Sequence, residues 1–280
     1  VLHAMTPLRQ RMLEELCRYN YAPRTQQTYV AQIAKLARHY GVSPDRLTRE
    51  QVQEYQDLLT SQGVSWLPQA VAALQFFYNK TLGRDWKITH SSRRKPKKLP
   101  TVLTPGEVSR LLAAVEQRKA RMLLTVMYGC GLRISEAARL EVRDIDSQRR
   151  VLHIRQGKGR KDRYAPLGTT LLEALRDYWR AERPSSFLFP GGQADQPLGV
   201  AAVREEFRLA KRLAGIETPC TTHTLRHSYA SHCLAAGMEV GAIQQVLGHA
   251  SLETTATYTH VTAGATGAAG AFPDLLDERL

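Results

Sequence analysis

A basic stretch punctuated by proline divides the chain into two parts. Between Lys87 and Lys98 lie six Lys or Arg residues and no acidic residue. Pro96 and Pro100 favour an extended backbone there. A chain of 280 residues has room for two domains, at roughly 100–200 residues each. We therefore expect domains over residues 1–86 and 104–262, a basic interdomain linker over 87–103 and a flexible C-terminal tail over 263–280.

The first domain is predicted to be a small bundle of about four helices. Apolar residues between Tyr29 and Tyr40 recur at helical spacing after Thr25, a candidate N-cap. Thr48 and Gln51 fit a capping box, which begins a second amphipathic helix. Two more helices are expected near residues 5–20 and 71–83.

The second domain is predicted to be mainly helical around a small β-hairpin sheet. Thr104, Pro105 and Glu107 have the pattern of a capped helix start. A helix breaks at Gly129 to Gly131, and another begins near Ser135. Two strands are expected over 150–155 and 163–167, on either side of a loop with a basic tip. Helices are expected over 171–178 and 203–213. Another helix, capped by Thr222 or Thr224, is expected to end at Gly237.

The formal net charge of +13 favours a polyanionic partner, and nucleic acid before an anionic membrane. The alternative is a basic surface that only keeps the protein soluble. No uncharged apolar run approaches the roughly 18 residues of a membrane helix. The N-terminal residues lack a secretory pattern, Met5 is the expected native start, and the four cysteines form no CxxC pair. We expect a cytoplasmic, bacterial, nucleoid-associated protein with no membrane partner.

Reactive side chains are concentrated in five segments of the second domain. They are Arg133 with Glu136, Lys158 in the hairpin loop, His223 with Arg226, His249 after a helix-ending glycine, and Tyr258. Each has a structural alternative: an ion pair, a solvated turn, a helix cap or a half-buried aromatic ring. Together they suit phosphoryl chemistry, because arginines and histidines can hold phosphate oxygens while a tyrosine attacks and a lysine protonates the leaving oxygen.

Metal and nucleotide chemistry fit the sequence less well. The chain has neither a carboxylate cluster suited to two metals nor a GxxxxGK[ST] loop. A zinc site from Cys220, His223, His227 and Cys233 is an alternative, although the segment lacks the Glu of HExxH and places Arg226 between the histidines. We expect no metal and no cofactor.

The order of these motifs resembles the tyrosine recombinases, or phage-integrase family, in the XerC/XerD-like branch or among transposon-type integrases. The motifs that carry the resemblance are Gly129 to Glu136, Gly157 to Arg163, His223 to Ala230, Leu247 to His249 and Thr254 to Val261. They cover the second domain, and the first looks like that family's core-binding, SAM-like domain. Integron integrases carry an extra helical insertion before the His-x-x-Arg motif, for which residues 189–220 leave little room.

The resemblance implies a role for each matching residue. Arg133 and Arg226 would clamp the scissile phosphate, with Glu136 supporting Arg133. Lys158 would be the general acid, with Lys161 a second candidate. His223 would assist proton transfer, His249 would bond the phosphate, and Tyr258 would attack to leave a 3′-phosphotyrosyl enzyme without metal or ATP. Further contacts to the DNA backbone are expected from the linker and the hairpin loop, through Arg93, Arg94, Lys95, Lys97, Lys98, Arg160 and Lys161.

The same resemblance implies a C-shaped clamp of two domains around double-stranded DNA, with strand exchange in a homo-tetramer and a monomer or dimer in the absence of DNA. Three alternatives remain: a transposase of the same chemistry, a relaxing enzyme like a type IB topoisomerase, and a non-cleaving DNA-binding accessory protein. The tail ends in the apolar residues Phe272, Leu275 and Leu276 beside acidic ones. It either folds back on its own domain or docks on a neighbouring protomer.

Overall fold

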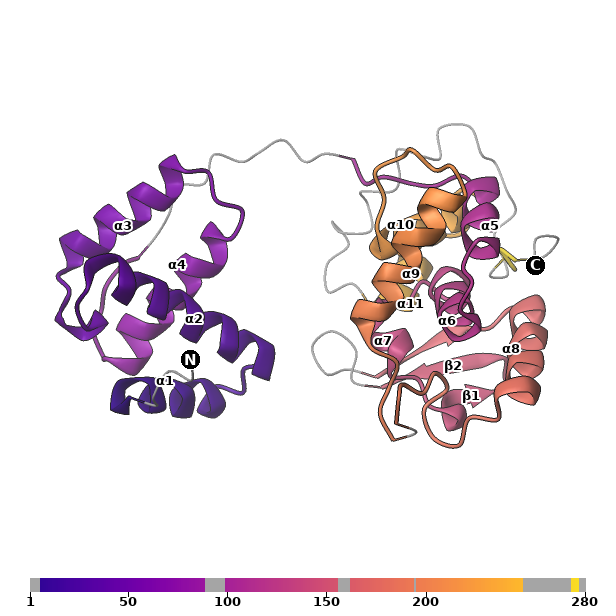
Figure 1. The fold of residues 1–280 in the computed structure, drawn as a ribbon, viewed down its shortest axis with the longest axis horizontal. Helices are drawn as coiled ribbons and strands as arrows, with labels where there is room; N and C mark the ends of the chain where they lie inside the picture. Colours follow the sequence, from indigo (N-terminus) through magenta and orange to yellow (C-terminus); the bar gives the residue numbers. More distant parts are fainter. Residues whose placement is uncertain (1–5, 89–98, 156–161, 194, 249–272, 277–280) are drawn as a thin grey trace. The chain divides into compact units, whose positions relative to one another are not determined.

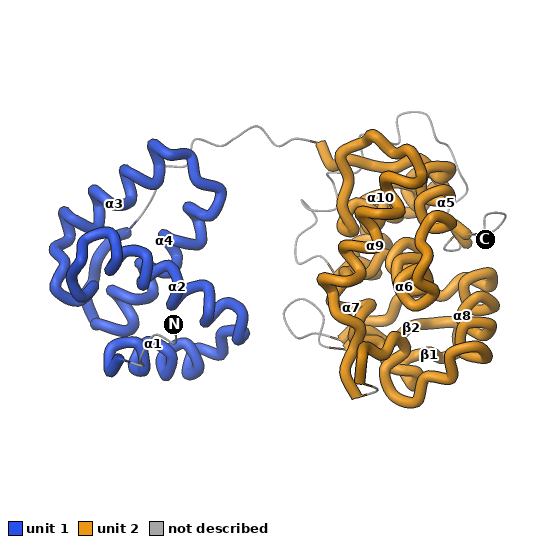
Figure 2. The backbone as a smooth tube through the Cα atoms, viewed as in Figure 1, with its two compact units in different colours: residues 1–97 blue, residues 98–280 orange. Residues whose placement is uncertain are grey.

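The computed structural model describes residues 6–88, 99–155, 162–193, 195–248 and 273–276. The chain forms two compact units, residues 1–97 and 98–280 (Figure 2). The division falls inside the predicted basic linker. Within the described ranges, no helix is long and apolar enough to cross a membrane.

The first unit is a helical bundle (Figure 1). Its core is built by apolar side chains such as Leu16, Leu36 and Leu74, which are almost fully buried. The predicted capping box of Thr48 and Gln51 is confirmed, whereas Thr25 lies inside a helix that begins at Pro23. The elements are α1 (Pro7–Arg18), α2 (Pro23–Tyr40), η1 (Pro44–Arg46), α3 (Arg49–Ser61), α4 (Leu67–Phe76) and the π-helical turn η2 (Phe77–Thr81).

The second unit surrounds a small sheet with helices, so the predicted mainly α fold is confirmed. Thr104 and Glu107 form the expected capping box. The cap of the helix that carries His223 is Thr221, and not Thr222 or Thr224 as predicted. The helices are α5 (Pro105–Ala113), α6 (Arg118–Gly129), α7 (Ile134–Ala138), η3 (Val142–Asp144), α8 (Thr169–Glu182), α9 (Val200–Leu213), α10 (Thr222–Ala235) and α11 (Val240–Leu247).

The sheet has three antiparallel strands in the order β1 (Ile145–Asp146), β2 (Val151–Ile154) and β3 (Arg163–Pro166). The predicted hairpin is present, and β1 is an additional short strand. On β2, Leu152 and Ile154 are buried and alternate with half-buried residues, as a strand with one face on a core requires. The register pairs Ile154 with Arg163, so Arg163 stands at the end of the sheet from which the hairpin loop leaves.

Part of the tail packs on its own unit. Asp274 accepts a hydrogen bond from the backbone N–H of Thr170 at 2.8 Å, in the first turn of α8. Leu276 is 2% exposed and joins the core of the unit. Of the two possibilities left open for the tail, the structure therefore shows the fold-back for residues 273–276.

Candidate active site

The turn between α6 and α7 places Arg133. Gly131 adopts a positive φ of 62°, and a Cβ there would lie 2.6 Å from the ring of Tyr229. Both the backbone and the packing therefore require glycine. The turn puts Arg133 at the N-cap of α7, where its backbone N–H donates to Glu136 Oε2 at 2.9 Å.

Glu136 is the centre of a network of three arginines. Its side chain is 7% exposed. Arg133 Nη1 donates to Oε1 at 2.8 Å. Arg163 forms a two-pronged pair, with Nη1 to Oε1 at 3.0 Å and Nη2 to Oε2 at 2.8 Å. Arg226 Nη1 lies 3.8 Å from Oε2. One carboxylate thus joins α7, β3 and α10.

The network holds Glu136 in its charged form. Burial alone would raise the pKa of this carboxyl group. The hydrogen bond and charge of Arg163, together with the backbone N–H and charge of Arg133, outweigh burial and lower the pKa to about 2. Glu136 is therefore an anion at every pH at which the protein would work, and it fixes the guanidiniums around it.

Arg226 lies on α10 and is 1% exposed. Nη1 donates to the carbonyl oxygen of Gly131 at 2.7 Å, and Nη2 donates to that of Leu247 at 2.5 Å. These bonds tie the α6–α7 turn to the C-terminal end of α11, where carbonyl groups carry partial negative charge. Arg133 is the more accessible of the two predicted phosphate-binding arginines, at 22% side-chain exposure.

Two histidines extend the site along α10. The rings of His223 and His227 lie 4.6 Å apart, edge to face. Desolvation by the surrounding protein, then the charges of Arg226 and Arg133, lower the pKa of His223 below 6.5, with Glu136 opposing. Burial, His223 and Arg226 lower the pKa of His227 to about 4. Both rings are therefore mainly neutral near pH 7.

The structure brings four of the predicted residues into one site: Arg133, Glu136, His223 and Arg226. The remaining predicted residues lie outside the described ranges, namely Lys158, His249, Tyr258, Arg160, Lys161 and the linker residues Arg93, Arg94, Lys95, Lys97 and Lys98.

Sequence reasoning gives no role to Arg163 beyond the first residue of a strand, although this residue ends one of the motifs. Its side chain is 10% exposed, which is unusual for an arginine at a strand end next to a basic loop. The sequence feature that could have identified Arg163 is a charged residue at the start of a strand that continues with mainly apolar residues.

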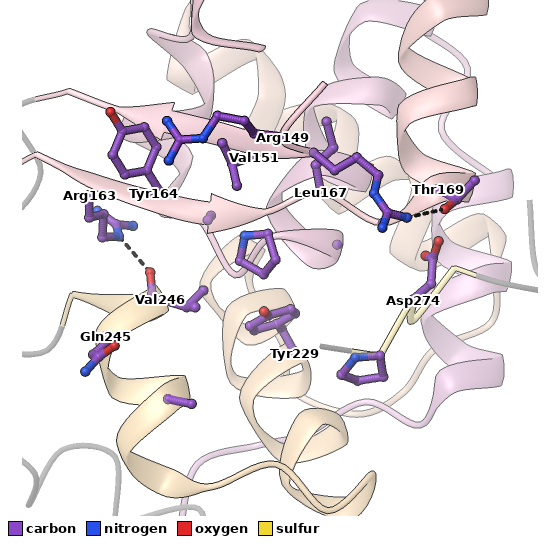
Figure 3. Close-up of a pocket in the computed structure, with 17 residues that line it drawn as sticks. Arg149, Val151, Arg163, Tyr164, Leu167, Thr169, Tyr229, Gln245, Val246 and Asp274 are labelled. Carbon is purple, nitrogen blue, oxygen red and sulfur yellow. Dashed lines mark hydrogen bonds between the residues drawn. The ribbon is translucent and has the colours of Figure 1, made fainter. Parts of the chain in front are cut away.

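A cavity of about 700 Å³ lies beside this network (Figure 3). Arg149, Tyr164, Tyr229 and Asp274 line it, and Arg163 borders it with its bond to Val246. Arg133, Glu136, His223 and Arg226 do not line it. The predicted phosphate-binding residues thus lie outside the cavity, and the candidate active site is the network.

The zinc alternative finds no support in the geometry. Among the described residues, which include Cys220, His223, His227 and Cys233, no group of three or more His, Cys, Asp or Glu side chains could hold a metal ion.

Comparison with known proteins identifies the family of the chain. Residues 101–264 match the phage integrase family, and residues 8–88 match the phage integrase N-terminal SAM-like domain. A putative integrase/recombinase of Sinorhizobium fredii is 46% identical over 92% of this chain and 85% of its own length. The tyrosine recombinase XerA of Pyrococcus furiosus is 39% identical over 60% of each chain. The crystal structure of the XerH site-specific recombinase bound to a palindromic difH substrate has a TM-score of 0.71, at 22% identity over 90% of this chain and 81% of that one.

The fold is that of the tyrosine recombinases. The chain belongs to the phage integrase family.

Proposed function

We propose that this protein is a site-specific DNA recombinase that cuts and rejoins duplex DNA through a 3′-phosphotyrosyl intermediate. The observation that carries the proposal is the network of Arg133, Glu136 and Arg226, which fixes two guanidiniums in one site. Relatives named integrase/recombinase and tyrosine recombinase support it.

In the proposed reaction, the oxygen of Tyr258 attacks the phosphorus of the scissile phosphodiester. A bond forms between that oxygen and phosphorus, and the bond to the 5′ oxygen of the sugar breaks. Lys158 gives its proton to the departing oxygen, which becomes a free 5′-hydroxyl. Arg133 and Arg226 stabilise the additional negative charge of the five-coordinate state, and His249 bonds the same phosphate. The phosphotyrosyl ester keeps the bond energy, so rejoining needs neither ATP nor metal.

His223 is suited to receive the proton of the tyrosine. Its pKa lies below 6.5, so the imidazole is mainly neutral near pH 7 and can accept a proton. The positive charges of Arg226 and Arg133, which lower this pKa, would also favour the tyrosinate that forms as the proton leaves.

Strand exchange would take place in a homo-tetramer on two DNA sites, with the two domains closed as a clamp around each duplex. The basic linker and the hairpin loop would contact the phosphate backbone through Arg93, Arg94, Lys95, Lys97, Lys98, Arg160 and Lys161. The stretch before α10 holds one helix, α9, among its described residues, which favours a transposon-type or Xer-type enzyme.

A suicide substrate tests the proposal. Duplex DNA that carries the recombination site and a nick beside the cleavage point loses its 5′-hydroxyl fragment and traps the covalent intermediate. We expect an adduct with the wild-type protein, with or without EDTA, and none with Tyr258→Phe, which should bind DNA within a few-fold of wild type.

Each alternative gives a different result in the same assay. An adduct with Tyr258→Phe would mean that another residue attacks. An adduct that requires added zinc or magnesium would contradict the metal-free mechanism. Binding without any adduct would indicate an accessory protein, and relaxation of supercoils without joining of two sites would indicate a topoisomerase-like enzyme.

A further inference from the structure

Arg163 uses every nitrogen of its guanidinium on protein acceptors. Nη1 and Nη2 form the pair with Glu136, at 3.0 and 2.8 Å. Nε donates to the carbonyl oxygen of Val246 at 2.7 Å (Figure 3). The side chain is 10% exposed. Because all three nitrogens of this guanidinium already donate to protein acceptors, we expect Arg163 to act through the residues it holds and not as a direct phosphate ligand.

The bonds of Arg163 connect it to Arg133 and to the end of α11, which both adjoin residues proposed to act in the reaction. Through Glu136 it reaches Arg133, which bonds the same carboxylate oxygen at 2.8 Å. Through Val246 it reaches the last turn of α11, directly before the segment that begins at His249. Arg163 itself is the first residue of β3, directly after the hairpin loop that contains Lys158.

The contact with α11 is also close in space. Gly248 has a positive φ of 62°, and a Cβ at this position would lie 3.1 Å from Cδ of Arg163. Arg163 thus fills the space beside the turn that leaves α11. Arg226 bonds the neighbouring carbonyl of Leu247, so two arginines bind the C-terminal end of this helix.

We propose that Arg163 is a positioning residue for DNA cleavage, which sets the place of Arg133 through Glu136 and fixes the end of α11 relative to the hairpin strand. The inference rests on the proposed recombinase function. It adds a residue that fixes Arg133, the end of α11 and strand β3 relative to one another in the absence of DNA.

The ion pair of Arg163 and Glu136 also affects the pKa of Glu136. The groups that face Glu136 are Arg133 from the start of α7, Arg163 from β3, and Arg226 and His223 from α10. Arg163 contributes most to the lowering of the Glu136 pKa. Without it, burial would be opposed less strongly, so the Glu136 pKa would rise and the carboxylate that orients Arg133 would be neutralised at a higher pH than in wild type.

The test compares Arg163→Met and Arg163→Lys with the wild-type chain. Single-turnover cleavage of the nicked substrate gives the rate, and a shift assay gives DNA affinity. We expect Arg163→Met to bind DNA within a few-fold of wild type and to cleave on the order of 10- to 100-fold more slowly, the loss typical of a misplaced reacting group. Arg163→Lys should recover part of the rate only, because an ammonium lacks the planar fork.

A matched control removes an arginine from the other end of the same sheet. Arg150 is exposed and donates to Thr169 Oγ1 at 3.3 Å. Arg150→Gln should cleave within about twofold of wild type. If Arg163→Met does not fold, Arg163→Lys becomes the deciding variant, with thermal unfolding near that of wild type as its check.

A pH profile separates positioning from general loss of structure. We expect the rate ratio of Arg163→Met to wild type to fall as the pH is lowered, because loss of Arg163 raises the pKa of Glu136 and the variant is protonated there before the wild type is. Protonation of His223 occurs in both proteins and cancels in the ratio. In a Glu136→Gln background the same ratio should be independent of pH.

Three results would overturn the proposal: wild-type cleavage by Arg163→Met, a rate loss matched by an equal loss of DNA binding, or a ratio that stays constant with pH. If the wild-type protein itself forms no adduct, the proposed function fails. If wild type cleaves and Arg163→Met cleaves equally well, only the positioning role fails.

Discussion

A single buried carboxylate allows three guanidiniums to share the candidate site. Arg133, Arg163 and Arg226 bring three positive charges against one negative charge on Glu136. The site therefore keeps an excess of two positive charges. That excess is suited to the two negative charges of a five-coordinate phosphoryl transition state. Glu136 reduces repulsion between the arginines without cancelling their charge.

Glu136 should make the stability of the catalytic unit depend on pH. Its pKa is about 2 in the folded protein, against 4.5 for an ordinary glutamate. The stabilisation is complete above pH 4.5 and is lost as the pH falls from 4.5 towards 2, because the unfolded chain binds the proton first. The shift corresponds to about 3 kcal/mol.

Replacing Glu136 by Gln removes this stabilisation and should lower the free energy of unfolding at pH 7 by about 3 kcal/mol. The replacement also leaves buried arginines without their anion, which acts in the same direction. Urea unfolding at pH 7, 5, 4 and 3 measures this, and the gap between variant and wild type should narrow towards pH 3. Glu205→Gln is the control, since Glu205 forms an exposed pair with Arg208. A gap that is constant with pH would contradict the low pKa of Glu136.

Charged side chains bind helix ends in this unit. The C-terminal carbonyls of α11 are bound by Arg163 and Arg226, and the first turn of α8 is bound by Asp274. In each case a charge of the favourable sign meets a helix terminus. The contacts of Arg163 and Asp274 join segments 83 and 104 positions apart, so they connect the hairpin and the tail to the helices.

The limits of sequence reasoning follow from the same contacts. Capping boxes such as Thr104 with Glu107 depend on residues three apart, so the sequence predicts them. The family motifs likewise identify Arg133, Glu136 and Arg226. The bonds of Arg163 to Glu136 and Val246 span 27 and 83 positions, and no local pattern marks them. The two-residue strand β1 is too short to show an alternating pattern, so the sequence does not predict it.

Gly168 provides a way to release the docked tail. A Cβ at Gly168 would lie 2.5 Å from the carboxyl carbon of Asp274, while its own φ of −61° suits any residue. Gly168→Ala should therefore displace Asp274 without straining the helix start. We expect faster proteolytic cleavage after residue 262 than in wild type.

The chain offers a matched control in Gly199. This glycine also caps a helix, with φ of −63°, and nothing lies within 4 Å of a Cβ placed there. Gly199→Ala should leave proteolysis of the tail unchanged. Equal protection of the tail in both variants would show that Asp274 is not held where the structure places it.

The basic linker should govern how binding depends on salt. Neutralising Arg93, Arg94, Lys95, Lys97 and Lys98 together would flatten the plot of log affinity against log salt, by about 0.9 for each phosphate that the variant no longer neutralises. Arg180 and Arg208, which are paired on helix surfaces with Asp177 and Glu205, serve as controls whose replacement should leave the slope nearly unchanged. An unchanged slope in the linker variant would show that the linker does not touch the backbone.

The tail could dock on its own unit or on a neighbouring copy of the chain. The structure docks residues 273–276 on their own unit, yet the surface of α8 that receives Asp274 is the same in every copy of the chain. Residues 263–272 could extend about 35 Å at most. We therefore propose that the tail exchanges between neighbours when a paired-site complex forms.

Cysteine pairs distinguish docking within one chain from exchange between chains. Thr170 and Asp274 are in direct contact, so Thr170→Cys with Asp274→Cys in one chain should form an internal crosslink. With the four native cysteines replaced by serine, a mixture of the two single variants can crosslink only between chains. We expect a product of twice the mass in that mixture when paired-site DNA is present, and none with a single site or with Asp274→Cys alone. If the mixture recombines DNA at full rate without this product, while the double variant crosslinks internally, the tail stays on its own chain during recombination.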